Sequence, residues 1–262
     1  MSRAVRRVIK SLLGRAGYEL RRAPGGEAYH RNGLADQARL LGDANGGAAG
    51  RSGVILDVGA NVGHSVLEYR RLFPDPTIHA FEPGAEALKE LRQRTAPLRN
   101  VHVHDFAVGD ADSTAVLHTH KGNFNNSLLP AAGAATHAGP DLQWAFESTG
   151  EQAIRTVRVD TFCRERGIDR VSVLKLDIQG YEAAALRGAG GMLAAGRIDL
   201  VYTEVLFATL YEGQAYFCDL AGALAAHRYE LFGIYNVGPE QWPQRKALGW
   251  GDALFLRPGF PL

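Results

Sequence analysis

Cysteines are few in this chain, and long apolar runs are missing. Cys163 and Cys218 are the two cysteines among 262 residues, and their spacing is not that of a metal site or a disulfide framework. We expect both to be packing residues in a reducing compartment, and hence a cytoplasmic protein. No stretch reaches the about eighteen consecutive apolar residues that a membrane-crossing helix needs. The sequence therefore predicts a protein that is soluble or, at most, peripheral to a membrane.

An excess of either charge is also missing, since 29 Lys and Arg face 28 Asp and Glu. Seven of the basic residues lie in the first 24 positions, where Glu19 is the single acid, so the remainder is acidic. Such a remainder gives no sign of the clustered basic residues that bind nucleic acids. From Val5 to Leu13, apolar residues recur at helical spacing among basic ones. This pattern is typical of an amphipathic helix that lies on anionic lipid, packs on the rest of the chain or frays.

The domain organisation follows from glycine content and periodicity. The glycine-rich residues 42–53 predict a linker, so residues 1–53 are expected to be a basic N-terminal extension with short helices. One of these helices, at 33–40, is expected to lie over the ligand site. The chain is 46% hydrophobic, enough for one large α/β domain, which we place at 54–262. Residues 121–150 show little periodicity and are expected to be an insertion that binds substrate.

The most informative stretch is VILDVGANVGHSV, residues 54–66. Apolar residues on both sides of Asp57 indicate a strand that is covered on both faces. Gly59 and Gly63 free the backbone at the following bend, and Ser65 can help to begin a helix. Peptide N–H groups at such a helix start attract a carboxylate or a phosphate. The stretch therefore predicts a turn that binds a nucleotide-like ligand.

The spacing of this turn argues against a dinucleotide. The pattern G-x-G-x-x-G, laid on Gly59, puts Asn61 and His64 where the second and third glycines are needed. A smaller anionic group, such as the amino-acid carboxylate of S-adenosylmethionine, suits the turn better.

Two further predicted strands end in acidic residues. TIHAF at 77–81 is followed by Glu82, and VHVH at 101–104 is followed by Asp105 and Phe106. An acid at the end of the second strand is where a ribose with two free hydroxyls is bound. Asp105 could accept from an adenine amino group while Phe106 packs against the ring. Each acid could equally well begin a helix or a turn.

The segment VSVLKLDIQG, residues 171–180, is a predicted buried strand that presents Lys175 and Asp177. Because ligands bind at the carboxyl ends of strands in open α/β sheets, Asp177 should face the reacting groups. Lys175 lies deeper and needs a partner, for which Asp57 is the candidate. Glu204 follows the next strand, at 200–203, and should emerge beside Asp177. These two carboxylates are the candidate catalytic pair, with Glu204 favoured as the base.

Carboxylates at strand ends can also bind a divalent cation such as magnesium. The sequence lacks an adjacent Asp-Asp pair, so a bound metal is an alternative that the residues do not favour. The histidine pairs of two predicted strands lack a third ligand that converges on them, and ordinary strand surface is the better interpretation; they are His102 with His104 and His118 with His120.

These motifs together resemble those of the FkbM family of S-adenosylmethionine-dependent methyltransferases. The stretches that carry the resemblance, within residues 54–257, are VILDVGANVGHS at 54–65, AFEP at 80–83, FAVGD at 106–110, VRVDTFC at 157–163, LKLDIQGYEAAALRGA at 174–189 and EVLFATLYEGQ at 204–214. The resemblance implies the class I methyltransferase fold, Rossmann-like, with a seven-stranded, mostly parallel sheet, an antiparallel last strand and helices on both faces. It also implies cofactor binding at the first three strands and methyl transfer to a hydroxyl of a sugar, a glycolipid or a secondary metabolite.

The candidate site residues fall into three groups. Those expected to bind the cofactor are Asp57, Gly59, Ala60, Asn61, Gly63, Ser65, Glu82, Pro83, Asp105, Phe106 and Asp177. Those expected to be catalytic are Glu204 and Asp177. Those expected to bind the hydroxylated acceptor through neutral donors and acceptors are Asn125, Ser127, Tyr211 and Gln214. The alternative function is a catalytically silent module that binds the cofactor and serves as a partner in a biosynthetic complex.

Overall fold

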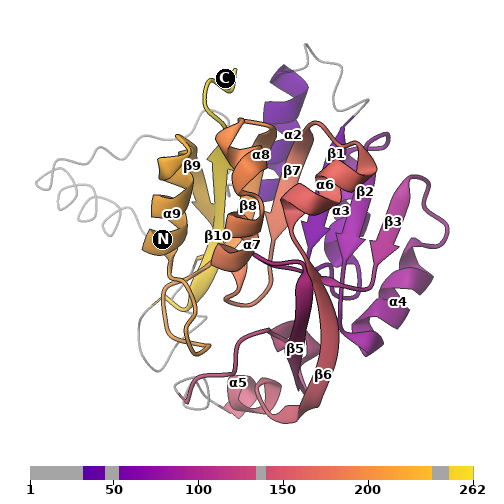
Figure 1. Cartoon of the computed structure of the whole chain (residues 1–262), viewed down its shortest axis with the longest axis vertical. Coiled ribbons are helices and arrows are strands. Elements are labelled where there is room, and N and C mark those ends of the chain that lie inside the picture. The colour runs from indigo at the N-terminus through magenta and orange to yellow at the C-terminus, as the bar shows by residue number, and fades with distance from the viewer. Residues whose placement is uncertain (1–31, 45–52, 134–139, 238–247, 262) are drawn as a thin grey trace, which may run out of the picture. The chain divides into compact units, whose positions relative to one another are not determined.

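The computed structural model describes residues 32–44, 53–133, 140–237 and 248–261 (Figure 1). The basic amphipathic helix expected near the N-terminus and most of the glycine-rich linker lie outside the described residues. No helix in the described part of the chain combines the length and the apolar character that crossing a bilayer requires.

The main element is a seven-stranded sheet with the order β3-β2-β1-β7-β8-β10-β9. Its strands are β1 (Val54–Val58), β2 (Thr77–Phe81), β3 (Val101–His104), β7 (Val171–Leu176), β8 (Ile198–Leu206), β9 (Glu230–Tyr235) and β10 (Trp250–Leu256). Strand β10 runs antiparallel to both β8 and β9, while β1, β2, β3, β7 and β8 pair in parallel. The expected sheet with one antiparallel strand at the end of the chain is confirmed. The strand order reverses between β1 and β7, which is where ligands bind in such sheets.

Helices cover both faces of this sheet, as expected. They are α2 (Gly33–Ala44), α3 (His64–Leu72), α4 (Ala85–Thr95), α6 (Val159–Arg166), α7 (Glu182–Gly188), α8 (Gly190–Ala194) and α9 (Phe217–Ala226). Residues of α2, α3 and α4 belong to one hydrophobic core, and those of α6 to α9 belong to the other. In β1, Ile55 packs into the first core, whereas Leu56 and Val58 pack into the second. Figure 1 shows α7 and α8 in front of β7 and β8.

Helix α2 confirms the helix expected at 33–40 but does not lie over the ligand site. It packs against β9 and β10, where Leu40 and Leu41 are buried. Tyr235 of β9 donates its hydroxyl to Asp36 at 2.8 Å, and Gly33 lies against the ring of Tyr202. Helix α2 therefore covers the sheet at β9 and β10, and none of its described residues lines the cavity described below.

A smaller second sheet, with the order β4-β6-β5, forms what we call the arm, residues 107–157. It consists of β4 (Ala107–Val108), β5 (Ser113–His120) and β6 (Ser148–Val157), with η1 (Asn123–Asn125) and α5 (Pro140–Ala145) between the last two. In Figure 1 the long strands β5 and β6 extend away from the main sheet. The insertion expected at 121–150 is thus the outer part of a longer hairpin, in which residues 134–139 lie outside the described residues.

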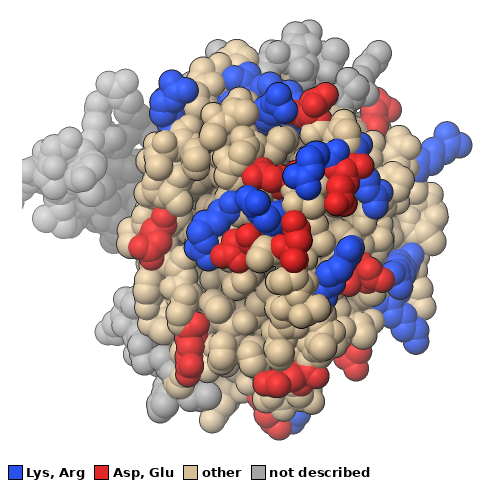
Figure 2. Space-filling view, in the orientation of Figure 1, with Lys and Arg blue, Asp and Glu red and all other residues tan. Residues whose placement is uncertain are grey.

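Charges of both signs are interspersed on the face drawn in Figure 2. Exposed ion pairs of the protein include Arg187 with Asp110 at 2.8 Å and Arg92 with Asp105 at 3.3 Å. Exposed pairs of this kind contribute at most about 1 kcal/mol each to stability. Neither pair lies among the residues that line the cavity described next.

Candidate active site

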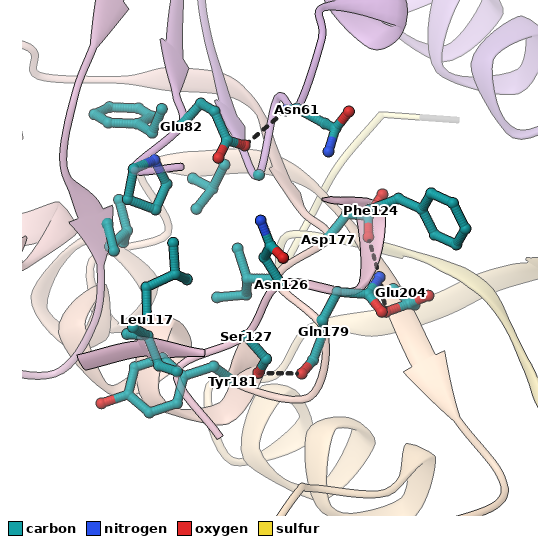
Figure 3. A pocket seen from close by; sticks show the side chains of 18 of the residues that line it. Asn61, Glu82, Leu117, Phe124, Asn126, Ser127, Asp177, Gln179, Tyr181 and Glu204 are labelled. Carbon is teal, nitrogen blue, oxygen red and sulfur yellow. Dashed lines mark hydrogen bonds between the residues drawn. The ribbon is translucent and has the colours of Figure 1, made fainter. Parts of the chain in front are cut away.

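A cavity of about 270 Å³ lies at the carboxyl ends of β1, β2, β7 and β8 and is closed on one side by the arm. Figure 3 shows Asn61 and Glu82 on one side of it, Asp177 and Glu204 on another, and Asn126 between them. The residues that line it are Val58, Gly59, Asn61, Phe81, Glu82, Pro83, Ala107, Val108, Leu117, Asn123, Phe124, Asn126, Ser127, Leu128, Asp177, Ile178, Gln179, Tyr181 and Glu204. The cavity thus brings both predicted catalytic residues together with five of the residues predicted to bind the cofactor, which are Gly59, Asn61, Glu82, Pro83 and Asp177.

In the turn after β1, several residues have a positive φ, which residues other than glycine rarely adopt. Gly59 and Gly63 have φ of 77° and 92°, and Asn61 has φ of 46°. A Cβ on Gly59 would lie 1.8 Å from the carbonyl oxygen of Asp177, so only glycine allows the turns after β1 and β7 to meet. Gly59 and Asn61 line the cavity, whereas Ala60 and Gly63 do not.

The peptide N–H groups of residues 59–63 already donate to protein acceptors, so within this turn they are not available to an anion. Gly59 and Ala60 donate to the carbonyl of Phe81, and Gly63 donates to that of Ala60. The N–H of Val62 donates to the side chain of Asn61, and the N–H of Asn61 donates to Glu82 at 2.9 Å. The turn therefore contributes shape and the position of Glu82 rather than free N–H donors.

Glu82 sits at the end of β2 with its carboxylate at the cavity wall, and only 6% of the residue is exposed. Its two oxygens accept from the N–H groups of Asn61 at 2.9 Å and of Gly84 at 2.8 Å. Burial raises the pKa of Glu82 to about 7, although these two hydrogen bonds oppose the shift. Each oxygen retains a further lone pair for a ligand hydroxyl.

A buried ion pair links β7 to β1, as the sequence predicts. Lys175 Nζ lies 3.1 Å from Oδ1 of Asp57 and 3.4 Å from Oδ2 of Asp177, and it donates to the carbonyl of Gly59 at 2.9 Å. Burial alone would lower the pKa of Lys175, but the charges of Asp57 and Asp177 outweigh it and raise the pKa. Ser65 donates to the other oxygen of Asp57 at 2.5 Å. Asp57 and Ser65 thus do not line the cavity, and they stabilise the turn through the ion pair and the hydrogen bond beneath it.

Glu204 emerges beside Asp177, as expected, although β8 continues two residues beyond it. Leu176 of β7 pairs with Thr203 of β8, which puts the following residues, Asp177 and Glu204, at the same level. Burial raises the pKa of Glu204 well above its usual value, and the negative charges of nearby acids raise it further. Those acids are Asp177, Glu182 and Asp252. A carboxylate with a raised pKa is a stronger base than a solvated one.

Gln179 joins the two carboxylates, and no sequence motif singles it out. Its side-chain Nε2 donates to Oδ1 of Asp177 and to Oε2 of Glu204, both at 3.0 Å. Its backbone has φ of 57°, and the next residue, Gly180, has φ of 93°. The only signal in the sequence is its position before a glycine at a strand end. A polar residue there predicts a turn and indicates no role in the site.

The arm supplies the opposite wall of the cavity. Asn123, Phe124, Asn126 and Ser127 all line it, and 58% of the surface of Phe124 is exposed. The side-chain oxygen of Asn126 accepts from the N–H of His120 at 2.8 Å, and its amide nitrogen lies on the side of Gly84. Ser127 donates to the carbonyl of Gln179 at 2.7 Å. The arm is thus fastened to the turn after β7.

Of the four residues expected to bind the acceptor, Ser127 lines the cavity and the other three lie behind it. Tyr211 is fully buried and donates to Gln179, and Asn125 offers its carbonyl to the same hydroxyl. The side chain of Gln214 accepts from the N–H groups of Leu210 and Tyr211 and donates to the carbonyl of Ala208. Tyr211 and Gln214 thus hold the segment after β8, and Asn125 joins the arm to it, so none of the three lies on the surface that an acceptor would contact.

The residues expected to contact adenine are arranged differently from the expectation. Pro83 lines the cavity, but the side chain of Asp105 is 65% exposed and pairs with Arg92 outside it. Phe106 packs into the core against Phe81 and Phe162. The reason is that the chain turns directly into β4 after β3, so that Ala107 and Val108 rather than Asp105 and Phe106 reach the cavity.

His79 of β2 and His104 of β3 are buried against each other, whereas His102 is exposed and lies on the strand surface, as expected. The rings of His79 and His104 lie 3.0 Å apart at Nδ1 and Nε2, and Phe162 packs edge-on against both. Burial lowers the pKa of His79 to about 3 and that of His104 to about 4, so both rings are neutral at pH 7. The described residues contain no group of three or more His, Cys, Asp or Glu that could hold a metal ion.

Comparison with known proteins gives a match to a family model described as the methyltransferase FkbM domain, over residues 57–231. The 2-O-methyltransferase NoeI of Sinorhizobium fredii is 28% identical over 164 residues, which cover 62% of this chain and 66% of NoeI. The 31-O-demethyl-FK506 methyltransferase FkbM of Streptomyces tacrolimicus is 30% identical over 152 residues, which cover 52% of this chain and 58% of that protein. The chain thus spans about two thirds or less of these relatives.

Among solved structures, fibrillarin of Aeropyrum pernix in complex with S-adenosyl-L-methionine aligns over 89% of this chain and 85% of its own, with 12% identity and a TM-score of 0.46. Magnesium protoporphyrin IX methyltransferase of Synechocystis, also with bound cofactor, aligns over 96% of each chain, with 8% identity and a TM-score of 0.43.

Proposed function

Because the chain belongs to the methyltransferase FkbM domain family, we propose that it is an S-adenosylmethionine-dependent O-methyltransferase. The acceptor is a hydroxyl of a sugar, a glycolipid or another secondary metabolite. The observation that carries this proposal is that Glu82, a carboxylate suited to a ribose, and Glu204, a carboxylate suited to a base, face one cavity.

The residues of the cavity fit the cofactor. Glu82 can accept from both ribose hydroxyls, because its remaining lone pairs face the cavity and its own position is fixed by two N–H groups. The apolar side chains of Pro83, Val108 and Leu117 suit the faces of an adenine ring. Asp177 supplies negative charge for the ammonium or the sulfonium. When bound, the cofactor supplies a methyl group on a positively charged sulfur.

Glu204 is better placed than Asp177 to act as the base. Both oxygens of Asp177 have partners, since Oδ1 accepts from Gln179 and Oδ2 lies 3.4 Å from the Lys175 ammonium. A carboxylate beside a cation holds its charge and accepts a proton poorly. Glu204 uses only Oε2, for Gln179, and within the described residues its Oε1 has no hydrogen bond. That oxygen is left to take the proton of an acceptor hydroxyl.

The protein's own contribution to the reaction is positioning and proton removal. Methyl transfer is an in-line displacement, so the cavity must place the acceptor oxygen opposite the sulfur. Glu204 takes the proton from that oxygen as the new bond forms. The exposed ring of Phe124 and the amides of Asn123 and Asn126 form a wall with one apolar and one polar part. Such a wall matches a polyhydroxylated ring with an apolar face.

The raised pKa of Glu82 predicts a pH-dependent affinity for the cofactor. Below pH 7 the carboxyl is protonated and accepts ribose hydroxyls less well, so affinity should fall about tenfold from pH 8 to pH 6. Calorimetry with adenosine measures this, because adenosine has the ribose but no titratable amino-acid group. Glu82→Gln should bind weakly at both pH values. Equal affinity of the unchanged protein at pH 6 and pH 8 would argue against ribose binding by Glu82.

The proposed function itself is tested by mass spectrometry. The purified protein is incubated with a methyl-labelled cofactor and a panel of sugars, glycolipids and hydroxylated metabolites. We expect a mass increase of one labelled methyl group on an acceptor and formation of S-adenosylhomocysteine. Tight binding of the cofactor with no methylated product across the panel would instead favour the catalytically silent module.

A further inference from the structure

Gln179 occupies an unusual position between the two carboxylates of the cavity. Its amide nitrogen donates one hydrogen to Asp177 and the other to Glu204, and it lies 3.0 Å from the accepting oxygen of each. An ionised carboxylate accepts hydrogen bonds and donates none, so the amide has one consistent orientation, with its nitrogen toward the two acids. Figure 3 shows these two hydrogen bonds between the ends of β7 and β8.

The other end of the same amide is held by a buried tyrosine. The hydroxyl of Tyr211 donates to Oε1 of Gln179 at 2.8 Å and lies 3.2 Å from the carbonyl of Asn125. A flipped amide would bring its carbonyl toward two acids and lose the hydrogen bond from the phenol hydroxyl, so the amide stays in the observed orientation. Tyr211 is 0% exposed, so water does not replace this donor.

The backbone of Gln179 is also restrained. Its φ of 57° is one that side-chain-bearing residues adopt at a cost, and such conformations persist where the surroundings hold them. Ser127 of the arm donates to its carbonyl at 2.7 Å, and Glu182 accepts from the N–H of Ile178 at 2.9 Å. Both the side chain and the backbone of Gln179 are therefore tied down from neighbouring elements.

We propose that Gln179 is the positioning residue for Glu204, holding Oε2 so that Oε1 faces the acceptor hydroxyl, with Tyr211 fixing the orientation of the Gln179 amide. This inference rests on the proposed role of Glu204 as the base. A glutamine suits this position because it donates to two acids without adding a third negative charge. Methionine has nearly the same length and no donor, so Gln179→Met removes the hydrogen bonds and leaves the backbone conformation in place.

Several titratable and charged groups face Glu204 and influence its titration. They come from β7 and its turn, from α7, from β10 and from the segment after β8, and they are Lys175, Asp177, Glu182, Asp252 and Tyr211. All remain unchanged in Gln179→Met. A change in the titration of Glu204 then reports the loss of the amide donor.

The test is a carboxyl ¹³C NMR titration of glutamate-labelled protein, with Glu204 assigned through Glu204→Gln. Loss of a hydrogen bond to the ionised form should raise the pKa of Glu204 by about one unit in Gln179→Met. Tyr211→Phe should produce a smaller rise in the same direction, because the amide stays but loses its anchor. Tyr229→Phe is the matched control, since Tyr229 is a buried tyrosine whose hydroxyl donates to the carbonyl of Ile198 at 2.7 Å. It should leave Glu204 unchanged.

An unchanged titration of Glu204 in folded Gln179→Met would overturn the inference, as would equal shifts in Tyr211→Phe and Tyr229→Phe. If Gln179→Met does not fold, Tyr211→Phe decides alone, because there the amide is retained. The titration requires no acceptor and so stands apart from the proposed function. Absence of methyl transfer by the unchanged protein would contradict that function and leave the NMR result as it is.

Discussion

Replacing Glu204 by Gln should lower the rate of methyl transfer by about 10² to 10⁴-fold, the usual contribution of a general base. Affinity for the cofactor should stay within about twofold, because Glu204 lies on the side of the cavity away from Glu82. Glutamine keeps the size of the side chain and can still meet Gln179, so the loss is that of a proton acceptor. The measurement is formation of S-adenosylhomocysteine with the acceptor found by mass spectrometry.

The pH profile sharpens this prediction. Because burial and the neighbouring acids raise the pKa of Glu204, the rate in the unchanged protein should rise with pH as Glu204 ionises. This rise of the rate with pH should be missing in Glu204→Gln. Asp177→Asn should mainly weaken cofactor binding, and Glu86→Gln, on the exposed surface of α4, should change neither property. A Glu204→Gln variant with full activity would remove Glu204 from the mechanism.

Of the proposed substitutions, Lys175→Met should lower the free energy of unfolding the most. Asp57 is 0% exposed, and Lys175 lies 3.1 Å from it, so the substitution leaves a buried carboxylate without a cation. Breaking a buried pair in this way costs about 3–5 kcal/mol, which lowers Tm by roughly 10 °C in a chain of this size. Thermal denaturation and urea unfolding measure it.

Two variants test this explanation. Lys89→Met removes an exposed lysine of α4 and should change stability by less than about 0.5 kcal/mol. Adding Asp57→Asn to Lys175→Met removes the uncompensated charge and should restore part of the loss, since both members of the pair are then neutral. If Lys175→Met were as stable as the unchanged protein, the ion pair would have no structural role.

The strands of the main sheet were predictable because each is buried and bounded by turn residues. In β1 and β2, four of five residues are buried, and strands that are buried on both faces are typical of the centre of a parallel sheet. Strand β6 was missed for the opposite reason. Its first six residues, up to Ala153, are mostly exposed, so neither a continuous nor an alternating apolar pattern marks it. Hairpins that project from a domain leave little periodicity in the sequence.

The site was predictable where a residue's place follows from its own strand. Glu82, Asp177 and Glu204 stand at strand ends, and the rules for open sheets bring them to one cavity. The positions of Asp105 and Gln179 depend instead on contacts between distant segments. Asp105 is turned outward because β4 pairs with β6, and Gln179 acquires its partners from β8 and the segment after it. Such contacts have no local pattern.

The hydrogen bonds within the turn after β1 bear on the thermodynamics of ligand binding. Since the peptide groups of residues 59–63 have their partners inside the protein, this wall of the cavity is rigid before any ligand arrives. Little conformational entropy is then lost there on association. Affinity at that wall thus comes from preorganisation. The favourable enthalpy of binding must come from the few side chains that still have lone pairs free to accept, such as Glu82.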